Sequence, residues 1–212
     1  MELRTVFPAG LTAPALRDRM AVSRDEGMRG DGSLFRRGVT FEGEFKPAAV
    51  LVPIVMRPEP TLLLTQRTDH LPHHPGQISF PGGRIEPEDA HPEAAALREA
   101  WEEIGLNATS VELLGRLDPY RTITYYEVTP VVALVHPPFD LALDAHEVAD
   151  AFEVPLAFLL DRANHERRSR DTPTGKRDYW AMPWGERFIW GATAGMLVNL
   201  ADVLVGRPPH ND

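Results

Sequence analysis

The segment from Pro92 to Ile104 constrains the fold most, because it has the periodicity of a helix with a defined start and stop. Proline suits the first helical turn, and Gly105 suits the position just past the last. Runs of strand length precede it (AAVLVPIVMR and TLLLTQR, joined by the turn signal PEP) and follow it (VELLGRL and YYEVTPVVALV). The first two runs predict a β-hairpin. Strands on both sides of a helix predict an α/β or α+β sandwich.

The rest of the chain predicts further elements around this centre. A short helix is expected near Ala13 to Ser23, followed by a connector rich in glycine and charge. EVPLAFLL reads as a short helix, ERRSRDT and YWAMP as strand or loop, and WGATAGMLVNLADVLVG as an amphipathic helix. We expect one domain over residues 46–206, an N-terminal elaboration packed on its core over 1–45, and a tail over 207–212.

Composition narrows the class of partner. The 212 residues are 43% hydrophobic, enough for one sizeable core, and the net charge of -9 argues against nucleic acid and anionic membranes. There is no cysteine, which excludes a disulfide framework and a thiolate metal site and suits a reducing compartment. Neither a signal-peptide run nor a membrane-spanning run is visible. We therefore expect a cytoplasmic protein with a small-molecule partner.

The central helix gathers three carboxylates near its end. At 100° per residue, Glu99, Glu102 and Glu103 project from one side, and we expect the core face on the other, with Leu97, Ala100, Trp101 and Ile104. Like charges three or four positions apart each cost about 0.2 to 0.5 kcal/mol, and the last turn favours cations. The arrangement indicates either a solvated face or a site for a hard cation, Mg²⁺ or Mn²⁺.

The glycines of FPGG, just before this helix, would permit a tight turn or the close approach of a ligand. The whole stretch GGRIEPEDAHPEAAALREAWEEIGL resembles the Nudix box, and its second half, REAWEEIGL, fits throughout. In the first half Asp89 replaces the usual glutamate, and one additional residue precedes Arg98. A similar longer form occurs in the coenzyme A diphosphatase branch. The segment LLTQRTDHLPHHPGQISFPGG also resembles the upstream signature of that branch, except that Pro72 stands where arginine is usual.

The resemblance implies a Nudix α/β/α sandwich with a mixed sheet and a site for Mg²⁺ or Mn²⁺. It makes Glu99, Glu102 and Glu103 metal ligands, together with the carbonyl of Gly83. It also implies that Arg98 orients the carboxylates and that Asp89 is a structural hydrogen-bond partner. Three candidates for the general base stay open: Glu102 and Glu103 in the box, and Glu147 in a later loop.

Substrate contacts are expected from the signature preceding the helix and from a later basic run. Arg67 would meet a phosphate or close an ion pair between strands. The basic run would be solvated or would clamp the 3'-phosphate of coenzyme A. Loop histidines are expected at the surface or against substrate rather than on zinc, and three tryptophans in the core or in a homodimer interface. The residues of the signature are Arg67, Gly76, Gln77 and Gly82, and those of the basic run are Arg167, Arg168 and Arg170. The histidines are His70, His73 and His74, and the tryptophans are Trp180, Trp184 and Trp190.

The resemblance thus implies hydrolysis of the diphosphate of coenzyme A or acyl-coenzyme A to 3',5'-ADP and 4'-phosphopantetheine or its acyl form. An alternative is a Nudix hydrolase of ADP-ribose, NADH or another nucleoside diphosphate derivative. A further alternative is a Nudix-like module that binds a nucleotide without cleaving it.

Overall fold

The computed structural model of the chain describes residues 3, 6–7, 9–22, 27–31, 44–71, 74–172 and 175–206. Its helices are α2 (Ala13–Ala21), α3 (Pro92–Ile104), α4 (Leu156–Leu160) and α5 (Ala192–Val205), with short 3-10 turns at Ala108–Ser110 and Arg162–Asn164. The strands are β1 (Arg29–Gly30), β2 (Lys46–Val55), β3 (Thr61–Arg67), β4 (Ile78–Ser79), β5 (Gly82–Arg84), β6 (Val111–Arg116), β7 (Tyr120–Arg121), β8 (Tyr126–Val135), β9 (Val148–Pro155), β10 (Glu166–Thr172), β11 (Gly175–Trp184) and β12 (Arg187–Trp190). None of the described helices is long and apolar enough to span a membrane.

Strands β1 to β9 form one mixed sheet, as the α/β prediction requires. Its centre is the parallel pair β2 and β8, which stay in register from Lys46 with Tyr126 to Val55 with Val135. The predicted β2–β3 hairpin is present, although only Ile54 and Val55 pair with β3. Most of β3 pairs instead with β9, a strand that the sequence reading did not identify.

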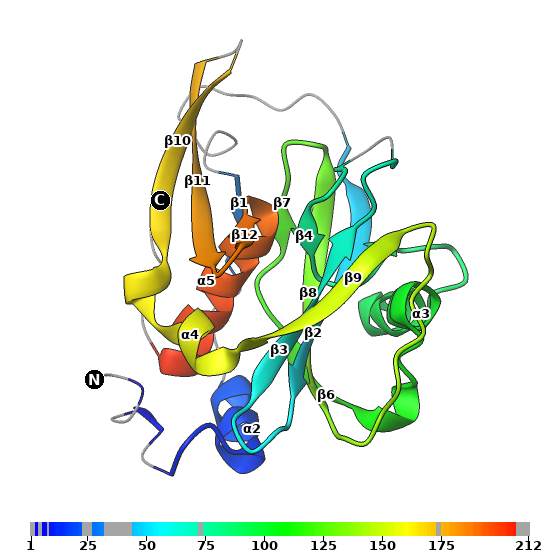
Figure 1. Cartoon of the computed structure of the whole chain (residues 1–212), viewed down its shortest axis with the longest axis vertical. Helices are drawn as coiled ribbons and strands as arrows, with labels where there is room; N and C mark the ends of the chain where they lie inside the picture. The colour runs from blue at the N-terminus through cyan, green and yellow to red at the C-terminus, as the bar shows by residue number, and fades with distance from the viewer. Residues whose placement is uncertain are drawn as a thin grey trace.

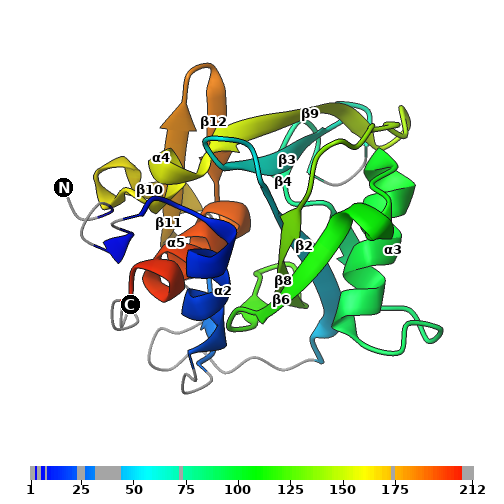
Figure 2. The ribbon, with the colours of Figure 1, turned by 90° about the horizontal axis from the view of Figure 1, so that it is seen from below.

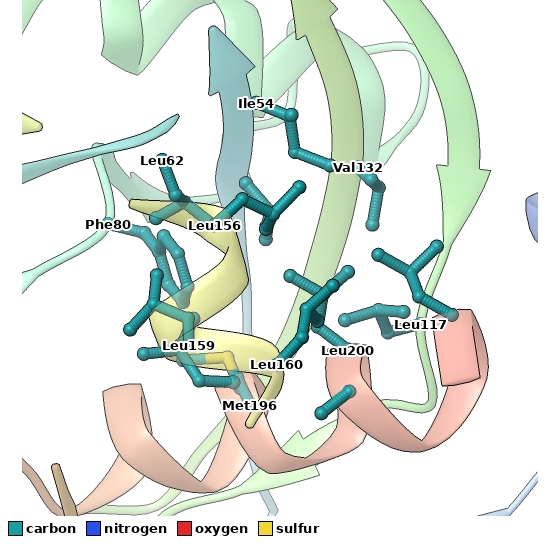
Figure 3. Close-up of a cluster of buried hydrophobic side chains, with 14 of the residues drawn as sticks. Ile54, Leu62, Phe80, Leu117, Val132, Leu156, Leu159, Leu160, Met196 and Leu200 are labelled. Atoms are coloured by element: carbon teal, nitrogen blue, oxygen red, sulfur yellow. The ribbon is translucent and has the colours of Figure 1, made fainter. Parts of the chain in front are cut away.

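Side chains alternate between the two faces of this sheet, which gives the domain two cores. On one face α3 covers Ala49, Leu51 and Leu63. On the other, α2, α4 and α5 cover the larger core, which contains Val52 and Ile54 and is drawn in Figure 3. Figure 2 shows the sheet between α3 on one side and α5 with α2 on the other, so the chain is an α/β/α sandwich.

Helix α3 has the predicted bounds because both ends carry local signals. The His91 side chain accepts a hydrogen bond from Ala94 N, Pro92 starts the first turn, and Gly105 adopts a left-handed φ of 66° while its N–H donates to Trp101 O. The expected core face was only partly right, since Ala100 and Ile104 are fully buried as expected but Trp101 is not. Trp101 is 57% exposed, whereas Glu103 is only 5% exposed and belongs to the buried face together with Ala95, Ala96, Ala100 and Ile104.

The C-terminal part forms a second, antiparallel sheet in the order β10, β11, β12. Its long β10–β11 hairpin extends past the end of the main sheet in Figure 1. EVPLAFLL is a helix only from Leu156, since its first residues complete β9. Helix α5 is buried along most of its length rather than amphipathic, because it lies between the second sheet and α2. The proposed ends of the domain stay predictions, and the tail 207–212 lies outside the described residues.

Candidate active site

The guanidinium of Arg98 organises the carboxylates around α3. Its Nε and Nη2 donate to the two Asp89 oxygens at 3.1 and 2.9 Å, and Nη2 also donates to Arg84 O at 3.0 Å. Its Nη1 donates to Glu99 Oε1 and Glu102 Oε2, both at 2.9 Å. Arg98 therefore ties the loop before the helix to the carboxylates on it. Asp89, held also by Glu86 N at 2.8 Å, makes the structural hydrogen bonds that the resemblance implied.

Glu103 lies deeper than the other carboxylates of the helix. Its Oε2 accepts a hydrogen bond from Gly82 N at 3.2 Å, in the glycine turn (Gly82 and Gly83) that begins β5. Burial, only partly offset by that bond, raises its pKa to about 8, and the Glu99 charge adds to the rise. Burial also raises the pKa of Glu99, although Arg98 opposes it. The arginines of the site therefore do not fully stabilise the ionised forms of these two carboxylates.

Strands β3 and β9 bring two further predicted residues to this place. Arg67, at the end of β3, has Nη1 3.9 Å from Glu103 Oε1 and 4.0 Å from Glu147 Oε2. Its Nε is buried without a hydrogen-bond partner. Glu147 immediately precedes β9, is half exposed, and its backbone carbonyl accepts from Thr68 N at 3.0 Å. We call Glu99, Glu102, Glu103 and Glu147 the acidic cluster.

The glycine turn is built close against the cluster. A Cβ atom on Gly83 would lie 2.5 Å from Glu99 Oε1, so a larger residue there would displace the Glu99 carboxylate. Gly82 has a φ of 155° and lies against the backbone of β2, where a side chain would collide. The two glycines therefore keep the backbone within reach of the carboxylates.

These donors fit a hard divalent cation, although the carboxylates now turn toward arginine. Within the described ranges, no three His, Asp or Glu side chains are arranged as a ready metal cage. Arg98 Nη1 instead donates to one oxygen of Glu99 and one oxygen of Glu102. All the donors are nevertheless oxygen atoms, which Mg²⁺ and Mn²⁺ prefer. The uncompensated burial of Glu103 and the space kept by Gly83 are what a cation next to the helix would require.

Comparison with known proteins decides the family. Residues 45–183 match the NUDIX domain. The Nudix hydrolase NudL of Escherichia coli strain K12, itself uncharacterized, is 42% identical over 156 residues, which are 74% of this chain and 81% of that protein. The chain belongs to the Nudix family. It is a Nudix hydrolase, an enzyme that acts on pyrophosphate bonds of nucleoside diphosphate derivatives.

Solved structures share the Nudix fold at lower identity. The Nudix hydrolase RenU of M. smegmatis is 21% identical with a TM-score of 0.53, and the match covers 89% of this chain and all of that one. A C. elegans Ap4A hydrolase binary complex is 23% identical with a TM-score of 0.45, over 52% of this chain and 80% of that one. The RenU likeness supports the fold of this Nudix domain and nothing finer.

Two predicted substrate contacts of the Nudix domain lie on the other side of β3. Gly76 and Gln77 line a pocket of about 650 Å³ with Gln66, Arg187 and Trp190. Gln77 also holds the loop in place, since its carbonyl accepts from Arg67 N at 2.9 Å. The sequence reading did not single out Gln66 or Arg187, because no local motif marks β12. Pro72 and His73 lie outside the described residues.

The basic run is divided between two faces of the second sheet. Arg167 lies over the Trp180 ring at 4.9 Å on the face that packs toward α5. Arg168 and Arg170 lie on the opposite face, over Phe188 at 4.9 Å and over Trp190 at 5.3 Å. A three-arginine clamp does not form, because successive residues of a strand point to opposite sides. Of the three tryptophans, Trp180 and Trp184 pack on the core, whereas Trp190 lines the pocket.

Proposed function

We propose that this Nudix hydrolase cleaves the diphosphate of coenzyme A or acyl-coenzyme A with Mg²⁺ or Mn²⁺, giving 3',5'-ADP and 4'-phosphopantetheine or its acyl form. The observation that carries the chemistry is Glu103, buried against the glycine turn with its nearest cation 3.9 Å away. Such a carboxylate needs a cation to ionise at neutral pH. The choice of coenzyme A rests on the upstream sequence signature and on the lengthened box with Asp89.

The residues that would hold the ion are Glu99, Glu102 and Glu103, with the carbonyl of Gly83. When bound, the ion would neutralise phosphate oxygens and lower the pKa of an attacking water. Arg98 contacts Glu99 and Glu102. Its two hydrogen bonds to Asp89 would hold the guanidinium in place, so that it can orient these carboxylates when they bind the ion.

Two further residues would act on the substrate directly. Arg67, whose side chain is partly exposed, would donate from its terminal nitrogens to a phosphate oxygen and offset the charge of the diphosphate. Glu147 would accept the proton of the attacking water as the bond between phosphorus and the bridging oxygen breaks. Its half-exposed carboxylate suits this role better than that of Glu103, since water reaches it without opening the core.

A substrate panel tests the proposal. The protein is incubated with Mg²⁺ and coenzyme A, acetyl-coenzyme A, dephospho-coenzyme A, ADP-ribose or NADH in ¹⁸O water, and the products are identified by mass. We expect 3',5'-ADP and phosphopantetheine species, one of them carrying a single ¹⁸O, and no product in EDTA. Cleavage of ADP-ribose without cleavage of coenzyme A would overturn the choice of substrate.

ADP-ribose, NADH and related nucleoside diphosphates are the second candidate. The observation that favours them is Pro72, which stands where the coenzyme A branch usually has arginine. If that arginine contacts substrate in the branch, this chain lacks the contact. Replacing Pro72 with Arg should then raise turnover of coenzyme A relative to ADP-ribose.

A further inference from the structure

A pocket on the far side of β3 from α3 has the surface of a nucleoside site. It lies between the loop at residues 75–78 and strand β12, and its volume is about 650 Å³. Two aromatic rings, Phe188 and Trp190, line it together with polar groups of Gln66, Gln77 and Glu186. Heteroaromatic rings bind to such surfaces, because the rings stack while amides and carboxylates bond the ring edges.

Two arginines lie next to these rings. Arg168 and Arg170 extend from β10 over Phe188 and Trp190, and Arg168 is exposed. A purine that binds next to these rings would therefore have two cationic groups close to it. The acid nearest to Arg168 is Glu166, whose Oε2 accepts from Arg168 Nε at 2.6 Å. That pair is exposed, so an incoming phosphate can replace the carboxylate at low cost.

The pocket is connected to the acidic cluster through adjacent residues. Gln66 and Arg67 are neighbours on β3, yet Gln66 reaches Arg187 on the pocket side while Arg67 approaches Glu103 on the α3 side. The loop carrying Gly76 and Gln77 is bonded to both, since Gly76 O accepts from Gln66 Nε2 and Gln77 O accepts from Arg67 N. A molecule that crosses the end of β3 would contact both places.

We propose that the pocket binds the nucleoside end of the diphosphate substrate, with the purine against Phe188 and Trp190 and a ribose phosphate on Arg168 and Arg170. This inference rests on the proposed function, because it concerns the other end of the same molecule. It makes Arg168 and Arg170 the residues that distinguish coenzyme A from its dephospho form. Arg167, one position away but on the opposite face, takes no part.

Binding of adenosine 3',5'-bisphosphate and of 5'-AMP to the whole protein in EDTA tests the pocket without turnover. By calorimetry we expect the wild type to bind the bisphosphate more tightly. The double change Arg168→Ala and Arg170→Ala should weaken bisphosphate binding at least tenfold and 5'-AMP binding less than threefold, as expected for charged hydrogen bonds to one phosphate. Arg167→Ala is the control, because it removes one positive charge from the same strand but from the opposite face.

Two further variants have expected effects of different kinds. Phe188→Ala should weaken both nucleotides about tenfold, because both lose the same stacking surface. Glu166→Gln should strengthen the bisphosphate alone, because it removes the carboxylate that competes for Arg168. Thermal unfolding of each variant separates lost binding from lost folding.

The outcomes separate this inference from the proposed function. Equal affinity of the wild type for both nucleotides, or an equal effect of Arg167→Ala and the double change, would overturn the inference even if coenzyme A is cleaved. Conversely, selective bisphosphate binding that depends on the two arginines would support the pocket even if coenzyme A is not cleaved.

Discussion

Replacing Glu103 with Gln tests whether the active site is destabilised by its own charge. Gln keeps the size of the side chain and can still accept the hydrogen bond from Gly82 N through its amide oxygen. It removes only the ionisable group. The variant should therefore be more stable than the wild type in the absence of metal, although it lacks a proposed metal ligand.

The size of the effect follows from the pKa. Burial raises the pKa of Glu103 from 4.5 to about 8, so the folded protein holds a proton there that the unfolded chain has lost. Below pH 4.5 the free energy of unfolding of the wild type, relative to that of the variant, does not depend on this group. It decreases as the pH rises from 4.5 to about 8 and is lowest above about pH 8. The full difference corresponds to about 5 kcal/mol.

Urea unfolding in EDTA at pH 5 and pH 9 measures this difference directly. We expect the advantage of Glu103→Gln to be below about 1 kcal/mol at pH 5 and several times larger at pH 9. Glu102→Gln is the control, because that side chain is 55% exposed and its ion pair with Arg98 lies at the surface. Its effect should stay within about 1 kcal/mol at both pH values.

Magnesium should reverse the order of stability. At pH 9 it should stabilise the wild type more than Glu103→Gln, because only the wild type offers the buried charge to the ion. An advantage of the variant that is the same at pH 5 and pH 9 would refute the argument, since a packing effect carries no such pH dependence. So would equal stabilisation of both proteins by magnesium.

Three further predictions concern neighbouring positions. Gly83→Ala should lower turnover at least a hundredfold in a folded protein, because the methyl group would meet Glu99 at 2.5 Å; normal magnesium-dependent turnover would contradict this use of glycine. Glu147→Gln should abolish turnover and spare substrate affinity, as steady-state kinetics and calorimetry would show, and near-normal turnover would remove Glu147 from the mechanism. Arg116 holds the pKa of Glu93 at about 2, so this pair contributes stability above pH 4.5 that is lost as the pH falls toward 2. Glu93→Gln should therefore cost about 2 kcal/mol at pH 7, less than the full shift of the pKa corresponds to because solvent screens the half-exposed Arg116, and little at pH 2. Urea unfolding measures both, and an equal cost at the two pH values would disprove the charge effect.

The sequence predicted those elements whose signals are local. Helix α3 has a proline at its start and a glycine at its end, and its bounds are those expected. The β2–β3 hairpin has a turn signal between two apolar runs and was also found. Strand β9 was missed because it carries an acid on each face, Asp150 and Glu153, and its pairing with β3 makes it a strand.

The sequence predicted which carboxylates come together on α3 but not how deeply each of them is buried. Periodicity placed Glu99, Glu102 and Glu103 together, whereas the approach of Arg67 Nη1 to within 4.0 Å of Glu147 Oε2 depends on the pairing of β3 with β9. Periodicity could not tell which side of α3 faces the sheet, since the helix has polar residues on most sides. The pocket was beyond local reasoning, because Gln66 and Arg187 lie 121 positions apart in the chain.

The alanines of α3 explain how a carboxylate comes to lie in the core at all. Ala95, Ala96 and Ala100 have no exposed surface, and their small side chains let the helix lie close to β2 and β5. At that distance Glu103 reaches the Gly82 amide, and Glu99 reaches the space above Gly83. Larger apolar residues would bury more surface but would hold the helix away from the glycine turn. The helix therefore buries less apolar surface than larger side chains would, and its carboxylates lie closer to the backbone of the glycine turn. The magnesium-dependent stability described above would measure how much of the lost stability an ion restores.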